Sequence, residues 1–304
     1  MEEEENVDLT ELLEAKTTKK KLINKILIIV TIVFTVIIVA VIVGLLLAKS
    51  HNEKLLAEYN KKMANIIKQE QEKKEEKKPK LPVYSENAKN RMQNIYSQEG
   101  EEKIVYLTFD DGPSSNITPQ ILEILESENV KATFFVLGSR AELYPELVKQ
   151  EYEAGHYIAN HGYSHNYKAI YSSPEAVLNE YNTTEEIIRQ AIGKESYSSY
   201  LFRFPGGSSG GKYATVKSAA MELLDQNNVA HINWNSLTSD AVGTPTQESI
   251  VSSLVSTSEG KNKVVVLMHD SGTKQLTADM LPHVIAYFRD NGYIFKNFYD
   301  IMQE

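Results

Sequence analysis

The 304-residue sequence contains no cysteine. This absence excludes disulfide bonds, a thiol nucleophile, Cys-ligated zinc and iron–sulfur clusters. Basic residues are scarce in residues 101–304, which hold 15 Lys and Arg against 26 Asp and Glu, whereas residues 1–100 hold 17 against 15. Because the acidic region has no basic stripe to offset phosphates, its composition excludes nucleic acid or another polyanion as its ligand.

Charge is also absent from residues 26–48, which read ILIIVTIVFTVIIVAVIVGLLLA. A helix of this length spans about 35 Å, enough to cross a bilayer core of about 30 Å. A buried helix of a soluble domain would show a polar face, and a cleaved signal peptide has a shorter apolar run before a small-residue site. We therefore expect an uncleaved transmembrane helix at 26–48.

The residues on either side of this run indicate its orientation and the nature of the segment after it. Five lysines lie at 16–25 and four at 49–62, a bias that favours a cytoplasmic tail at 1–25 and an exterior C-terminal part. Residues 49–101 are predicted to be an extracytoplasmic stalk and linker, with a helix over 52–78 that Pro79 and Pro82 end. A thin apolar stripe on that helix permits self-association as a short coiled coil, although it covers fewer than three heptads and a solvated helix is the alternative.

Residues 102–304 alternate between strand and helix patterns, which predicts one α/β domain with a mostly parallel sheet, open or closed. Six or seven such units would fit a barrel smaller than the usual eight, and ligands of both architectures gather at the carboxyl ends of strands. The predicted strands are 104–109, 131–138, 157–160, 199–204, 229–234, 263–269 and 293–298, and the predicted helices are 118–129, 143–155, 174–192, 247–258 and 277–291.

Two polar motifs follow the first and third predicted strands. Asp110 and Asp111 end an apolar strand before Gly112 and Pro113, which would let both carboxylates bend toward one site; a solvated Asp-Gly-Pro turn is the alternative. His161 and His165 have the i, i+4 spacing that suits two imidazoles on one metal ion, although two surface histidines by chance would look the same.

Further polar residues follow the later strands. Arg203 precedes Pro205, Gly206 and Gly207, so an arginine that orients an acid would stand beside backbone that a ligand can approach closely. The next strand brings Asn233 and Trp234, for which core packing is the alternative, and the last strong strand ends in Leu267, Met268, His269 and Asp270. Together, one Asp and two His make a three-ligand metal site with an open position, which leaves the second Asp as a base and His269 as an acid.

In this order, the motifs T-F-D-D-G-P, H-x-x-x-H, R-F-P-G-G and L-M-H-D resemble those of the polysaccharide deacetylases of carbohydrate esterase family four, the NodB-homology domain. The resemblance covers about residues 102–300 and implies a distorted barrel of about seven βα units with a divalent metal ion at its mouth. For the chemistry, it implies that Asp110 is the catalytic base, that Arg203 fixes this base, and that His269 is the general acid. The implied metal ligands are Asp111, His161 and His165. For the substrate, it implies that the backbone N–H of Gly206 donates to the oxyanion and that Trp234 and Leu267 are the walls of a slot for the acetyl group.

The sequence departs from the family at two positions. Gly162 stands where the family has Ser or Thr, which removes one hydroxyl that would tie down the histidine loop. Asn233 stands before Trp234, where the family has the Asp that supports the acid histidine by its charge. An Asn can hydrogen-bond an imidazole but cannot stabilise the imidazolium by a full charge, and Asp240 is a candidate substitute.

The resemblance predicts a membrane-anchored, metal-dependent enzyme that removes N-acetyl groups from a cell-wall glycan, with N-acetylglucosamine residues of peptidoglycan as the first choice. N-acetylmuramic acid, poly-N-acetylglucosamine, chitin-type oligomers and an O-acetyl ester are the other substrates considered. A non-catalytic glycan-binding scaffold is the alternative of another class. The ligand set suits Zn²⁺, and Co²⁺, Ni²⁺ or Mn²⁺ would also fit it.

Overall fold

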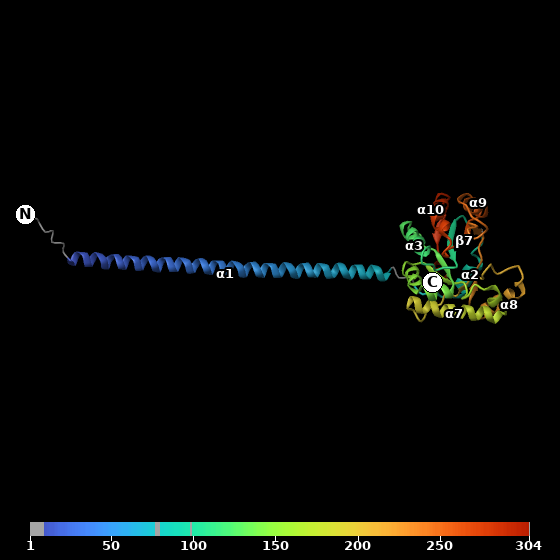
Figure 1. Ribbon diagram of the computed structural model, residues 1–304, viewed down its shortest axis with the longest axis horizontal. Helices are drawn as coiled ribbons and strands as arrows, with labels where there is room; N and C mark the ends of the chain where they lie inside the picture. Colours follow the sequence, from blue (N-terminus) through green and yellow to red (C-terminus); the bar gives the residue numbers. More distant parts are fainter. Residues whose placement is uncertain (1–8, 77–79, 98, 304) are drawn as a thin grey trace, which may run out of the picture. The chain divides into compact units, whose positions relative to one another are not determined.

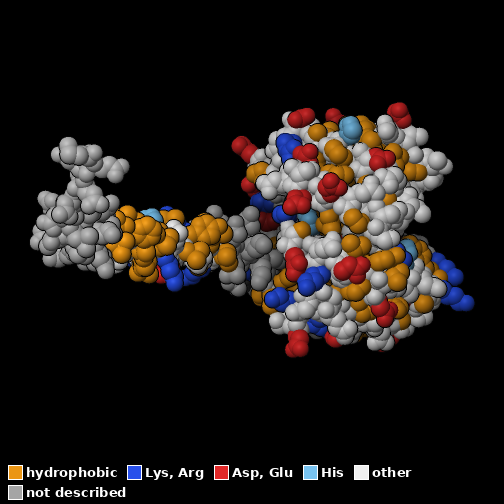
Figure 2. All heavy atoms as spheres, turned by 60° about the vertical axis from the view of Figure 1, so that its left-hand side comes forward, with side chains coloured by type: hydrophobic (Ala, Val, Ile, Leu, Met, Phe, Trp, Pro, Cys, Tyr) orange, Lys and Arg blue, Asp and Glu red, His pale blue; other side chains and the backbone are white. Residues whose placement is uncertain are grey.

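The computed structural model describes residues 9–76, 80–97 and 99–303, and the chain divides into two compact units, Met1–Glu76 and Lys77–Glu304. The first unit contains one long helix, α1 (Leu9–Glu76), which includes the predicted span 26–48 (Figure 1). It is long and apolar enough to cross a membrane, and Figure 2 shows many hydrophobic side chains on its described part, with basic side chains among them. The helix extends through most of the predicted stalk, whereas residues 1–8 of the predicted tail and Pro79 lie outside the described residues.

The second unit is built on a parallel sheet with strand order β5-β4-β3-β2-β1-β7-β6, and β8 pairs with β1 outside this path. Helices surround the sheet (Figure 1). The sheet and these helices together form the distorted (β/α) barrel that the sequence predicts. The strands are β1 (Ile104–Asp110), β2 (Thr133–Val136), β3 (Tyr157–Asn160), β4 (Leu201–Phe202), β5 (Ala230–His231), β6 (Ser236–Leu237), β7 (Lys263–His269) and β8 (Ile294–Lys296).

Strand β1 is an inner strand of the sheet, and all seven of its residues are buried, as expected for an apolar strand covered on both faces. Its first three residues pair with β8 and its last three pair with β2. Two short strands therefore share one side of β1, which distorts the barrel. Along its whole length β1 also pairs with β7, and this register sets Asp110 opposite His269.

Helix α7 begins and ends where local chemistry dictates. In α7 (Pro174–Ile192) the Ser173 side chain accepts from the N–H of Ala176, Pro174 takes the first turn, and Gly193 ends the helix in the left-handed region. The other helices are α2 (Glu86–Gln93), α3 (Thr118–Ser127), α4 (Gly138–Leu143), α5 (Pro145–Glu153), α6 (Tyr167–Ile170), α8 (Ala214–Gln226), α9 (Gln247–Ser258), α10 (Gln275–Asp290) and α11 (Tyr299–Met302).

Several predicted elements differ from the structure. The helix expected over 143–155 is α5, which begins at Pro145, whereas α4 precedes it without having been predicted. The strands expected over 199–204 and 229–234 retain only two residues each, Leu201–Phe202 and Ala230–His231. Helix α8 and strand β6 are present without having been predicted.

The predicted linker over 49–101 is wrong at its C-terminal end. Helix α2 lies within that range, and Ala88, Met92 and Ile95 are buried in the main core. The Arg91 side chain donates to the carbonyl oxygens of Ile301 and Gln303 at 2.7 and 3.0 Å. The globular unit therefore includes residues well before 102, because α2 covers apolar surface that would otherwise be exposed.

Candidate functional site

The predicted site residues converge at the carboxyl ends of the parallel strands. Asp110 is the last residue of β1, and the N–H of Asp270, just after β7, donates to the Asp110 carbonyl at 3.1 Å. His161 directly follows β3, and the N–H of Arg203, after β4, donates to the Asn160 carbonyl at 2.9 Å. Residues far apart in the sequence thus meet at one edge of the sheet.

Arg203 holds Asp110 in a fixed orientation. The guanidinium is fully buried over the ring of Phe135, and its Nη1 donates to Asp110 Oδ1 at 2.8 Å and to Thr108 Oγ1 at 2.7 Å. Burial raises the pKa of Asp110, and the positive charge of Arg203 opposes that rise. Since Arg203 engages Oδ1, Oδ2 is left facing the histidines, 3.7 Å from His161 Nε2.

Asp111, His161 and His165 offer three ligand atoms within 4.8 Å of one another. Asp111 Oδ1 lies 3.5 Å from His161 Nε2 and 3.3 Å from His165 Nε2, and this buried oxygen has no hydrogen-bond partner in the described part of the chain. A buried carboxylate oxygen without a donor is unfavourable unless a cation satisfies it, so the three residues fit a metal ion.

The tautomer of His161 suits metal binding. Its Nδ1 lies 2.7 Å from the carbonyl oxygen of Arg203, which can only accept a hydrogen bond, so Nδ1 carries the proton and Nε2 presents its lone pair toward Asp111. Burial lowers the pKa of His161 to about 3, so the ring is neutral at physiological pH. A neutral imidazole with a free Nε2 is the form that coordinates metals.

The structure explains why a glycine occupies position 162. Its φ is +80°, and a Cβ there would lie 2.9 Å from Ile170 Cδ1, so a larger residue would be strained. The Glu180 carboxylate accepts from the N–H groups of Tyr163 and Ser164 at 2.9 and 3.0 Å, and from the Ser164 hydroxyl at 2.5 Å. Glu180 from α7 therefore ties down the loop that carries both histidines.

His269 is paired with Asp240. Its Nδ1 lies 2.8 Å from Asp240 Oδ1, and the Asp240 carboxylate also accepts from the backbone N–H of His269 and from Thr277 Oγ1. Burial alone would lower the pKa of His269, but the hydrogen bond and charge of Asp240 outweigh it and raise that pKa. Because Nδ1 donates to Asp240, Nε2 is the ring nitrogen available to the site.

Asn233 does not support the acid, which corrects the first of the two residues proposed for that role. Its side-chain oxygen accepts from the N–H of Ser208 at 3.0 Å, and its amide donates to Ser208 Oγ at 2.8 Å. Its carbonyl accepts from Arg203 Nη2 at 3.0 Å. The carboxylate partner of His269 comes instead from Asp240, six residues beyond Trp234, because β6 pairs in parallel with β7 and the chain just after β6 stays beside His269.

The other predicted substrate-binding residues lie around this centre. Gly206 occupies a turn in which the N–H of Gly207 donates to the Phe204 carbonyl at 2.7 Å. A Cβ added to Gly207 would lie 3.4 Å from the Trp234 ring, so the half-buried Trp234 packs against this turn. Leu267 lies two residues before His269 on β7, and alternation along the strand puts both side chains on the same face.

Sequence reasoning missed two hydroxyl groups that fix these side chains, Thr108 against Arg203 and Thr277 against Asp240. Thr108 carries a signal that could have revealed it, since it alternates with Asp110 on the same face of β1. Thr277 carries no such signal, because it lies in α10 and reaches Asp240 only through tertiary folding.

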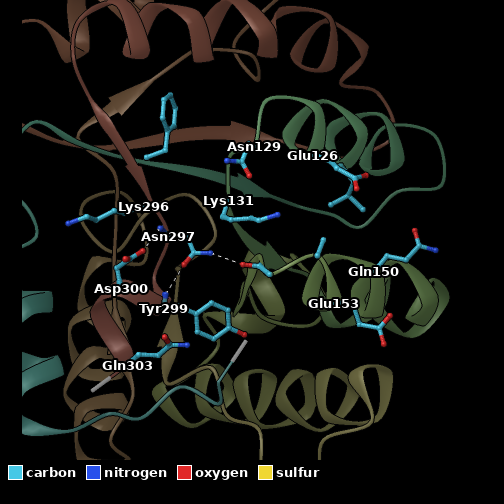
Figure 3. A pocket seen from close by; sticks show the side chains of 14 residues that line it. Glu126, Asn129, Lys131, Gln150, Glu153, Lys296, Asn297, Tyr299, Asp300 and Gln303 are labelled. Atoms are coloured by element: carbon cyan, nitrogen blue, oxygen red, sulfur yellow. Dashed lines mark hydrogen bonds between the residues drawn. The ribbon is translucent and has the colours of Figure 1, made fainter. Parts of the chain in front are cut away.

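A large cavity of about 860 Å³ lies away from the candidate site (Figure 3). Its lining includes Lys131 and Gly155, which precede β2 and β3, so it opens at the amino ends of the strands. The Asn297 side chain donates to the Gly155 carbonyl at 3.0 Å, and Figure 3 shows Lys296, Asn297 and Asp300 on the cavity wall. The proposed catalytic side chains are at the opposite ends of the strands, so this cavity is separate from them.

Known proteins resemble the chain over most of the length of the globular unit. A family model for polysaccharide deacetylase matches residues 97–224. A peptidoglycan-N-acetylglucosamine deacetylase of Bacillus cereus is 31% identical over 66% of this chain and 71% of its own length. A Streptococcus mutans CE4 esterase superposes with a TM-score of 0.62 at 29% identity, covering 71% of this chain and 92% of that one. The catalytic domain of a Eubacterium rectale peptidoglycan N-acetylglucosamine deacetylase superposes with a TM-score of 0.59 at 32% identity, covering 66% of this chain and 90% of that one.

Proposed function

Because the chain belongs to the polysaccharide deacetylase family, we propose that it hydrolyses the N-acetyl groups of N-acetylglucosamine residues in peptidoglycan and releases acetate. The observation that carries this proposal is the meeting of Asp110, the Asp111–His161–His165 set and His269 at one edge of the sheet. Relatives named as peptidoglycan-N-acetylglucosamine deacetylases support the choice of glycan.

We assign the metal site to Asp111, His161 and His165, with Zn²⁺ as the expected ion, since the donor set is one carboxylate and two neutral imidazoles. A divalent ion held there would polarise the acetyl carbonyl and make a nearby water more acidic. The unsatisfied Asp111 Oδ1 is the feature that supports this assignment, because no described protein group donates to it.

We assign the two proton transfers of the reaction to Asp110 and His269. Asp110 Oδ2 takes the proton of the attacking water, since Arg203 engages Oδ1 and keeps the carboxylate in place. His269 Nε2 gives a proton to the departing amine nitrogen, since Asp240 holds Nδ1 and favours the protonated ring. Without this proton the amine would have to leave as an anion, which is a far poorer leaving group.

The backbone N–H of Gly206 is proposed to donate to the oxygen that gains charge as water adds to the carbonyl. Support for this role comes from the turn itself, in which Gly207 and not Gly206 donates to Phe204. Leu267 and Trp234 would enclose the acetyl methyl group. The apolar helix α1 would anchor the enzyme in the membrane whose wall it modifies.

The test is acetate release from purified peptidoglycan, followed by mass spectrometry of the muropeptides. The expected product lacks the acetyl group of glucosamine and keeps that of muramic acid. Chelation should abolish the activity and one equivalent of Zn²⁺ should restore it, while Asp111→Asn should lose the metal. Asp110→Asn should keep the metal and lose turnover. Full turnover of a metal-free preparation would refute the mechanism.

A further inference from the structure

Tyr167 lies beside the proposed metal site without a role in the mechanism above. It is the first residue of α6, whose start is fixed by the Asn166 side chain accepting from the N–H groups of Lys168 and Ala169. The Tyr167 ring centroid lies 5.4 Å from that of His165 and 5.8 Å from that of Tyr171. The ring is therefore held between two aromatic neighbours, yet its side chain remains 41% exposed.

The hydroxyl of Tyr167 lies over Gly206. A Cβ added at Gly206 would lie 2.6 Å from this oxygen and 3.1 Å from Tyr167 Cζ, so the phenol occupies the space that a side chain at 206 would fill. Covalent geometry then limits the separation of the hydroxyl and the Gly206 nitrogen to about 5 Å. Two donors at that separation can reach one acceptor oxygen placed between them.

Both donors are free within the described residues. Phe204–Gly207 form a turn with Pro205 at its second position and Gly206, at φ +71°, at its third, the pattern of a type II turn. The turn uses the N–H of Gly207, and its Pro205 carbonyl accepts from Tyr171 and not from Tyr167, so no acceptor among the described residues takes the N–H of Gly206 or the hydroxyl of Tyr167. An ordinary phenol is protonated at neutral pH, so the hydroxyl can donate.

We propose that the Tyr167 hydroxyl is a second oxyanion donor, acting with the Gly206 N–H on the oxygen that becomes negatively charged as water adds to the acetyl carbonyl. This inference rests on the proposed deacetylase function. A pair of donors aimed at one developing charge is the usual construction of an oxyanion hole. Such an interaction strengthens in the transition state, so it acts on turnover rather than on substrate binding.

The experiment compares Tyr167→Phe with wild-type holoenzyme on purified peptidoglycan fragments. The variant keeps the ring against His165 and removes only the hydroxyl. We expect kcat to fall about 10- to 100-fold with KM and bound zinc unchanged, since loss of one oxyanion donor typically costs about 100-fold or more when no metal shares the charge. A methylphosphonamidate analogue of the acetamido group, which is tetrahedral and anionic, should bind more weakly by the same factor.

The matched control is Tyr163→Phe. It removes a hydroxyl from the same loop, where it donates to Glu142 at 2.9 Å and lies outside the catalytic set. We expect it to keep wild-type kcat and phosphonamidate affinity. An equal loss in both variants would overturn the proposal and indicate a general effect on the loop.

Other outcomes also overturn the inference. Wild-type kcat in Tyr167→Phe would exclude a role in the transition state, and a raised KM at unchanged kcat would assign the hydroxyl to the sugar in the ground state. A loss of zinc would assign it to support of the metal site. Failure of the proposed function itself is distinguishable, because wild-type holoenzyme would then release no acetate from peptidoglycan.

Discussion

The pairing of His269 with Asp240 determines how the proposed acid responds to pH. The Asp240 carboxylate raises the pKa of His269 against the opposing effect of burial, so the imidazole stays protonated to higher pH. Asp240→Asn removes that negative charge and should lower the pKa of His269. The alkaline limb of the kcat/KM profile, which reports loss of the acid, should therefore move to lower pH. An unmoved limb in Asp240→Asn would show that His269 is not the acid.

Asp270 is a second buried carboxyl whose protonation is coupled to folding. Burial raises its pKa to about 7, and its Oδ2 accepts from Thr118 Oγ1 at 2.6 Å beneath Gly112. Because the folded state holds this proton more tightly than the unfolded state does, the stability it contributes is complete below about pH 4 and is lost as pH rises toward 7.

Asp270→Asn should remove this dependence, since an amide does not titrate. In metal-free protein, the free energy of unfolding of the wild type should fall between pH 4 and 7 by an amount on the order of 3 kcal/mol more than that of the variant. Denaturant unfolding across this range measures it. Asp290→Asn, at an exposed acid, is the control and should retain the wild-type slope. Parallel curves for Asp270→Asn and wild type would contradict the prediction.

At the scale of elements, the glycine-rich loop 206–211 is hydrogen-bonded by two side chains, that of Lys217 and that of the anchor residue Asn233. Asn233 makes two hydrogen bonds to Ser208, and Lys217 Nζ donates to the Gly207 carbonyl at 2.6 Å. The Asn233 carbonyl also accepts from Arg203, so the anchor connects the loop to the residue that holds Asp110.

Asn233→Ala should release Ser208 and lower kcat about tenfold, because small displacements of a positioned donor are costly. Asn233→Asp retains an acceptor for the Ser208 N–H and can also accept from its hydroxyl, so it should restore most of the rate. The alkaline limb should stay in place in both variants, since Asp240 and not residue 233 contacts His269. A limb that moves upward in Asn233→Asp would contradict this assignment.

Helix α2 is the second element with a testable contribution. Met92 is 6% exposed within the main core, and truncating a buried Met to Ala typically costs about 2–5 kcal/mol. Met92→Ala should therefore lower the unfolding free energy of the globular unit by about that amount in denaturant titrations. Met63→Ala is the matched control, because Met63 is 37% exposed on α1 and should leave that transition unchanged. An unchanged midpoint in Met92→Ala would indicate that α2 does not stabilise the unit.

At the scale of the whole molecule, the apolar run in α1 is the candidate membrane anchor. If residues 26–48 cross the membrane with the N-terminus in the cytoplasm, the globular unit lies outside the cell with its substrate. A protease added to intact cells should cut between residues 49 and 80 and release an active fragment. Complete protection, in cells whose other surface proteins are digested, would reverse the orientation.

The sequence by itself determined the apolar span, the alternation of strands and helices, and the acids and histidines at the strand ends. These features are local: periodicity reports which faces are buried, and a polar residue directly after an apolar strand must lie at the edge of a sheet. Strand 263–269 and helix 174–192 were predicted with the bounds that they have in the structure. The motifs also identified the family before any fold was known.

Tertiary structure alone decided which side chains meet. Asp240 and Asn233 were both candidates beside His269, and only the parallel pairing of β6 with β7 brings Asp240 to the imidazole. Thr277 joins Asp240 from α10, Tyr167 covers Gly206 from α6, and α2 closes the core from a stretch that reads as a linker. Such contacts depend on the relative placement of elements distant in the chain, and that placement is fixed by packing in the core, which leaves no periodic trace in the sequence.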